Sequence, residues 1–279
     1  MSKTEHKPCY IQTEGDTVRL VQITDTHLCA NPGGTLLDMD TDRSLKLVIE
    51  RALQERGTPD GVLCTGDLSD QGSLQAYRRL IAHLQEIPAP DFWLPGNHDD
   101  LSEMQAAVGT SNRLCAEVLA GNWQVILLNS QIPGEVGGRL GSDELEKLRL
   151  ALERAQAEGL HSLVCLHHQP VAIGSAWIDQ QMVEDADQFW EIVDAASSVK
   201  GVLWGHVHQQ IDKRRGDIAL MASPSSCVQF APGSAMFKAD DKPPGYRWLD
   251  LCSDGSINTG VSRVTGVDFT VDLESGGYL

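Results

Sequence analysis

Residues 92–99 read FWLPGNHD, an apolar run that ends on Gly96, Asn97, His98 and Asp99. A turn requires the glycine and can use the asparagine, but it gains nothing from the imidazole and the carboxylate that follow. Taken alone, the stretch is equally compatible with an ordinary turn. The chemistry that it indicates therefore depends on how the other apolar runs of the chain end.

Short apolar runs of this kind recur along most of the chain. They are nearly continuous in apolar character, which is typical of strands covered on both faces. The runs span residues 18–24, 60–66, 91–96, 123–129, 161–167 and 200–206. Helical periodicity lies between several of them, in residues 41–56, 72–86 and 142–152, with Ser142 expected as an N-cap. Strands that alternate with helices predict an α/β fold.

The last part of the chain follows a different pattern. From residue 217 the helical period is lost, and an Asp-Gly pair separates two strand-like segments. Residues 217–265 are therefore expected to form antiparallel strands that complete the sheets, with a proline- and glycine-rich loop at 231–245. No domain boundary is visible, so residues 1–279 are expected to form a single domain.

Composition excludes several classes of protein. Apolar residues make up 41% of the chain, and no run approaches the roughly 18 consecutive apolar residues of a membrane helix. A formal net charge of -17 would repel a nucleic-acid backbone. Residues 1–10 lack the apolar core of a signal peptide. We therefore expect a cytoplasmic protein that binds neither nucleic acid nor membranes.

The seven cysteines are scattered and form no Cys-x-x-Cys pair. Neither a disulfide framework nor a zinc ribbon is therefore indicated. Cys64, Cys115 and Cys165 lie in apolar runs and are expected to be buried thiols. Such cysteines fit a reducing compartment.

Five of the apolar runs end in side chains that bind metals well. These are Asp25 and His27, Asp67, Asn97 and His98, His167 and His168, and His206 and His208. Ligands of an α/β sheet collect beyond the carboxyl ends of its strands, so these side chains are expected to converge. One histidine at one strand end is more often a hydrogen-bonded residue than a ligand. Five such ends together are not explained by turn chemistry.

The types of donor indicate the metals. Carboxylate, imidazole and amide groups suit Fe²⁺, Mn²⁺ or Zn²⁺ better than Ca²⁺ or Mg²⁺. The candidate ligands are too many for one tetrahedral ion and suit two ions that share a carboxylate. Two ions about 3.5–4 Å apart serve displacement at phosphorus, with hydroxide as the nucleophile. Neither a G-x-S-x-G elbow nor a G-x-x-x-x-G-K-[ST] phosphate loop is present to suggest another mechanism.

With these motifs in order, the chain resembles the calcineurin-like metallophosphoesterase superfamily. Its pattern D-x-H, G-D, G-N-H-[DE], H and G-H-x-H is met in full between residues 25 and 208. The resemblance implies a four-layer α/β/β/α sandwich, of the α/β (α+β) class, in which two mixed β-sheets are flanked by helices. It also implies two divalent metal ions at the strand ends, with Fe²⁺ or Mn²⁺ favoured and Zn²⁺ and Co²⁺ as further candidates.

The resemblance also implies a role for each residue of the motifs. The first metal would be bound by Asp25, His27 and His208, and the second by Asn97, His167 and His206, with Asp67 as the bridge. The catalytic residue would be His98, which would contact the phosphate and protonate the leaving oxygen. The substrate-binding residues would be His27, Asp67, Asn97, His98 and His208. Of the adjacent pair, His167 aligns with the ligand better than His168 does.

Within the superfamily, four segments are similar to the bacterial class III cyclic-nucleotide phosphodiesterases. They are residues 25–45, 166–179, 223–232 and 243–251. This resemblance implies a hydrolase of phosphoric diester bonds that converts 3′,5′-cyclic AMP to 5′-AMP by attack of a metal-bound hydroxide at the dinuclear centre. Two alternatives stay open. One is a phosphodiesterase of other cyclic nucleotides, glycerophosphodiesters or nucleotide conjugates, and the other is a non-catalytic, metal-dependent regulatory protein.

Four further positions have expected roles. Asp70 or Asp99 could orient a ligand histidine, and each could equally be a solvated loop acid or a residue at a helix N-terminus. Trp177 is expected to line the substrate pocket, whereas Trp204 is expected to lie in the core.

Overall fold

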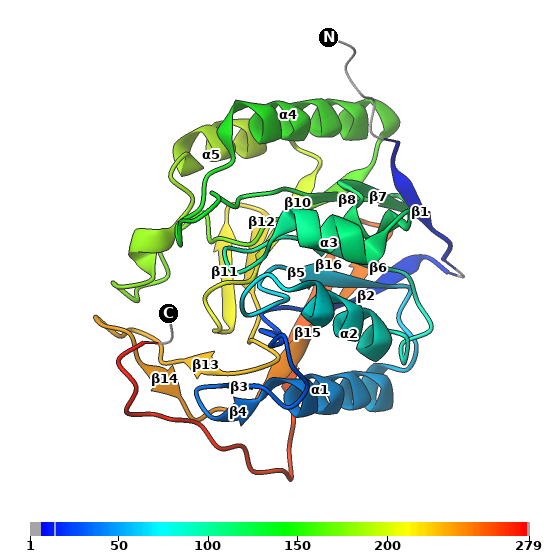
Figure 1. The fold of residues 1–279 in the computed structure, drawn as a ribbon. Coiled ribbons are helices and arrows are strands. Elements are labelled where there is room, and N and C mark those ends of the chain that lie inside the picture. Colours follow the sequence, from blue (N-terminus) through cyan, green and yellow to red (C-terminus); the bar gives the residue numbers. More distant parts are fainter. Residues whose placement is uncertain (1–6, 14, 278–279) are drawn as a thin grey trace.

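Two β-sheets pack face to face in the computed structural model, which describes residues 7–13 and 15–277, and helices cover their outer faces (Figure 1). The helices are α1 (Thr41–Arg56), α2 (Leu74–Leu84), α3 (Leu101–Val108), α4 (Gly141–Glu158) and α5 (Ala186–Ala195), with short 3₁₀ helices η1 (Asn112–Leu114) and η2 (Asp179–Gln181). None of the helices in the described ranges is long and apolar enough to span a membrane.

Both large sheets are mixed. The first has the order β1 (Cys9–Ile11), β7 (Glu117–Ala120), β8 (Trp123–Leu127), β9 (His161–Cys165), β10 (Val199–Trp204), β12 (Ile218–Ala222) and β11 (Ile211–Arg215). The second has the order β16 (Ile257–Arg263), β15 (Gly245–Cys252), β2 (Thr17–Ile23), β5 (Gly61–Thr65) and β6 (Asp91–Leu94). Two small ladders join β3 (Thr35–Leu36) to β4 (Met39–Asp40) and β13 (Gln229–Phe230) to β14 (Ala239–Asp240). The central strands β8, β9 and β10 run parallel, as do β2, β5 and β6.

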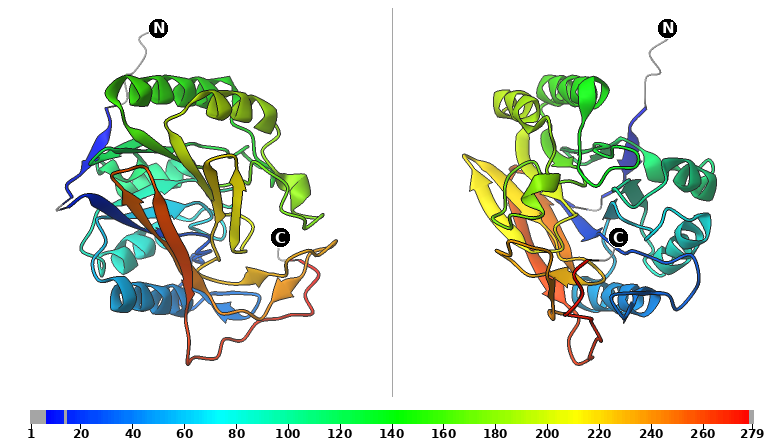
Figure 2. Two further views of the ribbon diagram at one scale, coloured as in Figure 1. Left: turned by 180° about the vertical axis from the view of Figure 1, so that it is seen from behind. Right: turned by 60° about the vertical axis from the view of Figure 1, so that its left-hand side comes forward.

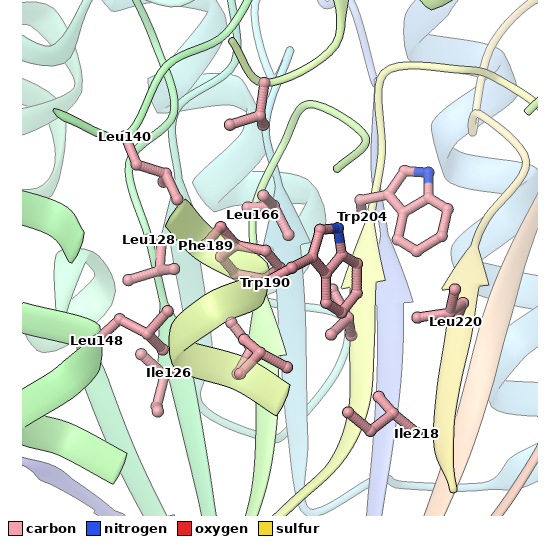
Figure 3. Close-up of a cluster of buried hydrophobic side chains, with 14 of the residues drawn as sticks. Ile126, Leu128, Leu140, Leu148, Leu166, Phe189, Trp190, Trp204, Ile218 and Leu220 are labelled. Carbon is pink, nitrogen blue, oxygen red and sulfur yellow. The ribbon is translucent and has the colours of Figure 1, made fainter. Parts of the chain in front are cut away.

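Alternating side chains divide the core into three apolar layers. In β5, Leu63 points toward the other sheet, whereas Val62 and Cys64 pack against α1, α2 and α3. In β10, Leu203 points inward, whereas Val202 and Trp204 belong to the apolar cluster under α4 and α5. Figure 3 shows Trp204 in this cluster with Phe189 and Trp190 of α5. The turned views show the same order of helix, sheet, sheet and helix (Figure 2). The predicted α/β/β/α sandwich is therefore confirmed, and its apolar strands are covered on both faces.

Local sequence accounts for the helices beside the second sheet. Helix α1 spans the predicted residues 41–56, and the carboxylate of Asp40 accepts a hydrogen bond from Arg43 N–H at 2.9 Å. Ser73 caps α2 in the same way, accepting from Ala76 N–H at 3.2 Å. Such caps satisfy N–H groups that have no partner inside the helix. Each helix buries one apolar stripe, as its period predicts.

Two expectations about the later elements were wrong. Helix α4 continues to Glu158, and its first N–H groups, on Leu140 and Gly141, donate to the carboxylate of Asp185 rather than to Ser142. The cap thus comes from a residue distant in sequence. Strand β12 pairs in parallel with β10 and antiparallel only with β11, so residues 217–265 are not wholly antiparallel. The β15–β16 hairpin is antiparallel, as expected.

The cysteines differ from expectation at one pair. Cys64 and Cys165 are fully buried, as predicted. Cys115 is only half-buried, and it forms a disulfide with Cys9, with the two Cα atoms 6.4 Å apart. The pair joins β1 to the start of β7. Because the two residues are 106 positions apart, their spacing gave no indication of the contact.

Arg247 of β15 joins the two sheets from inside the core. Its guanidinium group is fully buried and donates to the carbonyl oxygens of Ile211 and Ala222, at 3.1 and 2.8 Å. It also donates to the carboxylate of Asp212 at 2.8 Å. A buried arginine is tolerated only when its N–H groups are paired in this way.

Candidate dinuclear metal site

The loops after five strands bring the candidate ligands together. Asp25 and His27 follow β2, Asp67 follows β5, Asn97 and His98 follow β6, His167 follows β9, and His206 and His208 follow β10. Backbone hydrogen bonds tie neighbouring loops, from Asp25 N–H to the Gly66 carbonyl at 3.0 Å and from Gly205 N–H to the His167 carbonyl at 3.1 Å. The spacing of the donor atoms therefore rests on the sheets themselves.

One group consists of Asp25, His27 and His208, all fully buried. The Nε2 atom of His208 lies 3.3 Å from Asp25 Oδ1 and 3.2 Å from Nε2 of His27. Two donors of one ion with bonds of about 2.0–2.2 Å lie roughly 3.0–3.6 Å apart. The three side chains therefore have the separation that one divalent ion requires.

A second group lies on the other side of Asp67. The Nε2 atom of His167 lies 3.3 Å from Asn97 Oδ1 and 3.2 Å from Asp67 Oδ2. His206 lies beside His167, with one ring nitrogen of each within 4.8 Å of the other. The same Oδ2 atom of Asp67 is 3.8 Å from Nε2 of His27 in the first group. Asp67 thus lies between the two groups, where a bridging carboxylate would have to be.

Carbonyl oxygens orient three of the histidine rings. The Nδ1–H group of His167 donates to the Thr65 carbonyl at 2.8 Å, and that of His208 donates to the Val228 carbonyl at 2.7 Å. Each bond places the proton on Nδ1 and leaves the Nε2 lone pair directed at the site. His98 is held in the same tautomer by the Asp70 carbonyl at 2.8 Å.

The backbone at the candidate ligands is strained. Positive φ angles of 44° to 63° occur at Asp25, His27, Asp67, His206 and His208. Residues other than glycine rarely adopt this backbone conformation, which costs of order 1–3 kcal/mol at each residue. Gly96 has a related function, because a β-carbon there would collide with Asp67 and the His167 ring. Strain of this kind collects where a fold holds side chains in an imposed geometry.

Electrostatics couple the buried groups. Burial opposes ionisation of Asp67, but His167 and His98 outweigh it and hold the pKa of this carboxylate well below its usual range. Burial likewise lowers the pKa of His167, but Asp67 outweighs it and raises the pKa to about 9. Burial, together with His168 and His167, lowers the pKa of His206 well below its ordinary value. Because water does not reach these groups, the charge of the buried carboxylate is stabilised by the neighbouring imidazoles instead of by solvent.

The donor set fits divalent cations. Among the described residues, Oδ2 of Asp25 and Nε2 of His206 are buried and have no hydrogen-bond partner. Buried polar atoms without partners are costly, and a cation would satisfy the carboxylate oxygen. The set combines imidazole, carboxylate and one amide oxygen and contains no thiolate, which matches the borderline ions Fe²⁺, Mn²⁺ and Zn²⁺.

Two residues whose roles were open now have definite surroundings. The carboxylate of Asp99 accepts from backbone N–H groups of Leu68, Ser69 and Gly96, so it joins the loops after β5 and β6 instead of contacting a candidate ligand histidine. Asp70 is the acid beside such a histidine, with Oδ1 3.7 Å from Nδ1 of His27.

His168 also lies at the site. Its Nδ1 atom is 2.8 Å from the Ser130 hydroxyl, and one of its ring nitrogens lies within 4.8 Å of nitrogens of His167 and His206. Burial and the neighbouring His167 lower the pKa of His168 to about 3. The sequence had favoured His167 over His168 as a ligand. In the structure His168 is a neutral neighbour of both histidines of the second group.

A recess opens beside the second group of ligands. It encloses about 550 Å³ of free space, its mouth included, and its lining includes Asn97, His98 and His206. Its other walls come from the loops after β8 and β9, from the β13–β14 segment and from residues 276–277. Trp177 lines it, as expected, whereas Trp204 is fully buried in the core.

Sequence reasoning missed an aromatic support of the site. Phe230 stacks on the His208 ring, with centroids 4.0 Å apart and planes 4° from parallel. Trp177 in turn packs edge-on against Phe230, with centroids 5.2 Å apart. These contacts hold the His208 ring in place together with the Val228 carbonyl. Phe230 lies in β13, a strand of two residues, which is too short to show a period in the sequence.

Comparison with known proteins assigns the class. A family model described as calcineurin-like phosphoesterase matches residues 18–210, so the chain belongs to the calcineurin-like phosphoesterase family. The fold is shared with a dimetal phosphatase from Danio rerio at a TM-score of 0.60 and 13% identity, with 89% of this chain and 99% of that chain covered. At this identity the likeness concerns the fold alone.

Sequence relatives are more specific. The chain is 45% identical over 262 residues to the 3′,5′-cyclic adenosine monophosphate phosphodiesterase CpdA of Pseudomonas aeruginosa, covering 94% of this chain and 96% of the relative. It is 36% identical to the protein of the same name from Escherichia coli K12, over 94% of this chain and 95% of the relative. A 3′,5′-cyclic-nucleotide phosphodiesterase of Nostoc is 35% identical, over 88% and 92% respectively.

Proposed function

We propose that this chain is a metal-dependent phosphodiesterase that hydrolyses 3′,5′-cyclic AMP to 5′-AMP. The observation that carries the proposal is the position of Asp67, whose Oδ2 atom lies 3.2 Å from His167 of one ligand group and 3.8 Å from His27 of the other. The choice of cyclic AMP is supported by the similarity to the cyclic-AMP phosphodiesterases, which extends over 94% of the chain.

We assign the ligands as the motifs imply. Asp25, His27 and His208 would hold the first ion, and Asn97, His167 and His206 the second, with Asp67 between them. When bound, two divalent ions would neutralise the phosphate, activate water as a nucleophile and stabilise the charge of the transition state. A histidine binds a metal through a ring nitrogen that carries no proton. In His167 and His208 the hydrogen bond from Nδ1 to a backbone carbonyl keeps the proton on Nδ1, so that Nε2 can bind the metal.

We assign to His98 the transfer of a proton to the leaving group. Its Nδ1 proton is held by the Asp70 carbonyl, so only Nε2 exchanges a proton. Its backbone N–H donates to Asp67 Oδ1 at 2.9 Å, which fixes the residue beside the bridging carboxylate. Attack of water at phosphorus breaks the bond to the 3′-oxygen, and protonated His98 supplies the proton that this oxygen requires. The product is then 5′-AMP.

The test separates the two roles by mutation. His98→Ala should lower kcat for cyclic AMP by about 10²–10⁴-fold while the metal content stays near the wild-type value. Asp67→Ala should lose both metal and activity, because the bridge is gone. His161→Gln is the control, since His161 contacts the Ser253 carbonyl far from the ligands. Loss of metal in His98→Ala, or full activity with bound metal in Asp67→Ala, would contradict the assignment.

A broader specificity is the second candidate, because the Nostoc relative is named for cyclic nucleotides in general. The values of kcat/KM for cyclic AMP, cyclic GMP and a glycerophosphodiester decide between the two. Cyclic AMP should be preferred by tenfold or more if the first proposal is correct.

A further inference from the structure

Apart from the candidate metal ligands, His98 and the indole of Trp177, the recess beside the second ligand group has one polar side chain in its lining. Gln181, at the end of η2, lines the recess together with Val136 and Trp177. None of the side-chain hydrogen bonds formed within residues 7–13 and 15–277 involves the Gln181 amide. Its neighbour Gln180, which does not line the recess, donates to the Ala176 carbonyl at 3.2 Å. The Gln181 amide therefore remains available to a ligand.

Hydrogen bonds within the protein hold the loop that carries Gln181. The carboxylate of Asp179 accepts from Ile173 and Gly174 N–H at 2.8 and 2.9 Å, which closes the loop at its outer end. At its base, the Gln169 amide donates to the Ile178 carbonyl at 2.7 Å. These bonds lie within the protein and hold the backbone that carries Gln181, so a ligand need not pay the entropy of ordering this loop.

The apolar part of the lining is also held by contacts within the protein. Trp177 packs edge-on against Phe237, with centroids 5.3 Å apart, and both line the recess. Residues 276–277 also line the recess, at the end of a segment that passes around β14 (Figure 1). That segment is fixed by Asp272 N–H, which donates to the Leu37 carbonyl at 2.9 Å. The recess thus combines aromatic surface with the Gln181 amide, and His98 is also part of its lining.

We infer that this recess binds the adenine ring of the nucleotide, with the Gln181 amide hydrogen-bonded to the amino group and adjacent ring nitrogen of the base. A carboxamide offers one donor and one acceptor side by side, which is the complement of that edge of adenine. The indole of Trp177 would cover the apolar face of the ring. The inference rests on the proposed function and assigns the residue that selects the base.

The test pairs Gln181 with the amino group that it would contact. Turnover of cyclic AMP is compared with turnover of purine riboside 3′,5′-cyclic monophosphate, which lacks only this amino group, in wild type, Gln181→Ala and the control Gln180→Ala. Wild type and control should prefer cyclic AMP by about five- to tenfold. Gln181→Ala should lose this preference, with kcat/KM for the analogue within twofold of wild type. A preference that survives in Gln181→Ala, or an equal loss on both substrates, would overturn the inference while the proposed function stands.

Binding separates the inference from the activity. Calorimetry with 5′-AMP and purine riboside 5′-monophosphate measures the same pair without turnover. If the metal-loaded wild type hydrolysed no cyclic AMP, the proposed function would fail. Weaker binding of 5′-AMP to Gln181→Ala, by about five- to tenfold, would then still support the base site. Equal dissociation constants in wild type and variant would reject it.

Discussion

Replacing Asp99 should destabilise the protein through the loops of the metal site. Its carboxylate accepts from Leu68 N–H at 3.0 Å, from Ser69 N–H at 3.0 Å and from Gly96 N–H at 2.9 Å. It also accepts from the Tyr77 hydroxyl at 2.9 Å. The first two groups directly follow Asp67 and the third directly precedes Asn97. One side chain therefore connects the backbone of the candidate bridging residue to that of a candidate ligand of the second metal.

The magnitude follows from the groups that would lose a partner. Asp99 is 7% exposed, so Asp99→Ala leaves three N–H groups and a hydroxyl in a place that water barely reaches. Each such group costs about 1–3 kcal/mol. Part of this cost is offset, because burial and the charge of Asp67 raise the Asp99 pKa and so disfavour the ionised carboxylate that the substitution removes. We expect the free energy of unfolding to fall by about 3–6 kcal/mol. Asp99→Asn keeps one oxygen and turns an NH₂ group toward Gly96 N–H, which should cost about 1–3 kcal/mol.

Urea unfolding of chelator-treated protein measures these changes without any contribution from bound metal. Asp100→Asn is the matched control, because the Asp100 carboxylate caps α3 by accepting from Ser102 and Glu103 N–H and asparagine caps equally well. Its effect should stay within about 0.5 kcal/mol. An effect of Asp99→Ala no larger than that of the control would refute the assignment of Asp99 as the link between the loops.

Three other changes test the packing and the charges. Arg247→Ala should lower the free energy of unfolding by about 3–5 kcal/mol, because it leaves a cavity in the core and removes the donors of the Ile211 and Ala222 carbonyls. Asp212→Ala should cost less, since water that reaches this half-exposed carboxylate can take its place beside the guanidinium; equal effects in urea unfolding would contradict this. Burial lowers the pKa of His167, but Asp67 outweighs burial and raises it to about 9 in the metal-free protein. Metal binding must therefore displace a proton, and the affinity for Mn²⁺ measured by calorimetry should rise with pH up to about 9. An affinity independent of pH between 7 and 9 would contradict this prediction. Burial opposes the ionisation of Asp42, but hydrogen bonds from His83 and Arg79 outweigh it and lower the pKa of this carboxylate. Asp42→Asn should therefore be less stable than wild type at pH 7. The difference in unfolding free energy should shrink as the pH falls below about 4.

Local patterns in the chain predicted much of the fold. Helix α1 was expected at its observed bounds, because its apolar stripe lies within the helix itself. Its cap, Asp40, is the residue directly before the helix. The buried strands were recognisable because both of their faces are covered. The start of α4 was predicted wrongly, because Asp185, which accepts from its first N–H groups, is 44 residues beyond Gly141 in the sequence.

The candidate site divides in the same way. The sequence by itself determined the donor types, because each cluster is a short motif at the end of an apolar strand. Only the tertiary structure decided that Asp67 lies between two groups, that the carbonyls of Thr65 and Val228 orient two ligand rings, and that Gln181 faces the recess. The physical reason is that strand and helix periods act between near neighbours in the chain. Donor spacing, histidine tautomers and the shape of a recess depend on distances between residues brought together only when the sheets pack.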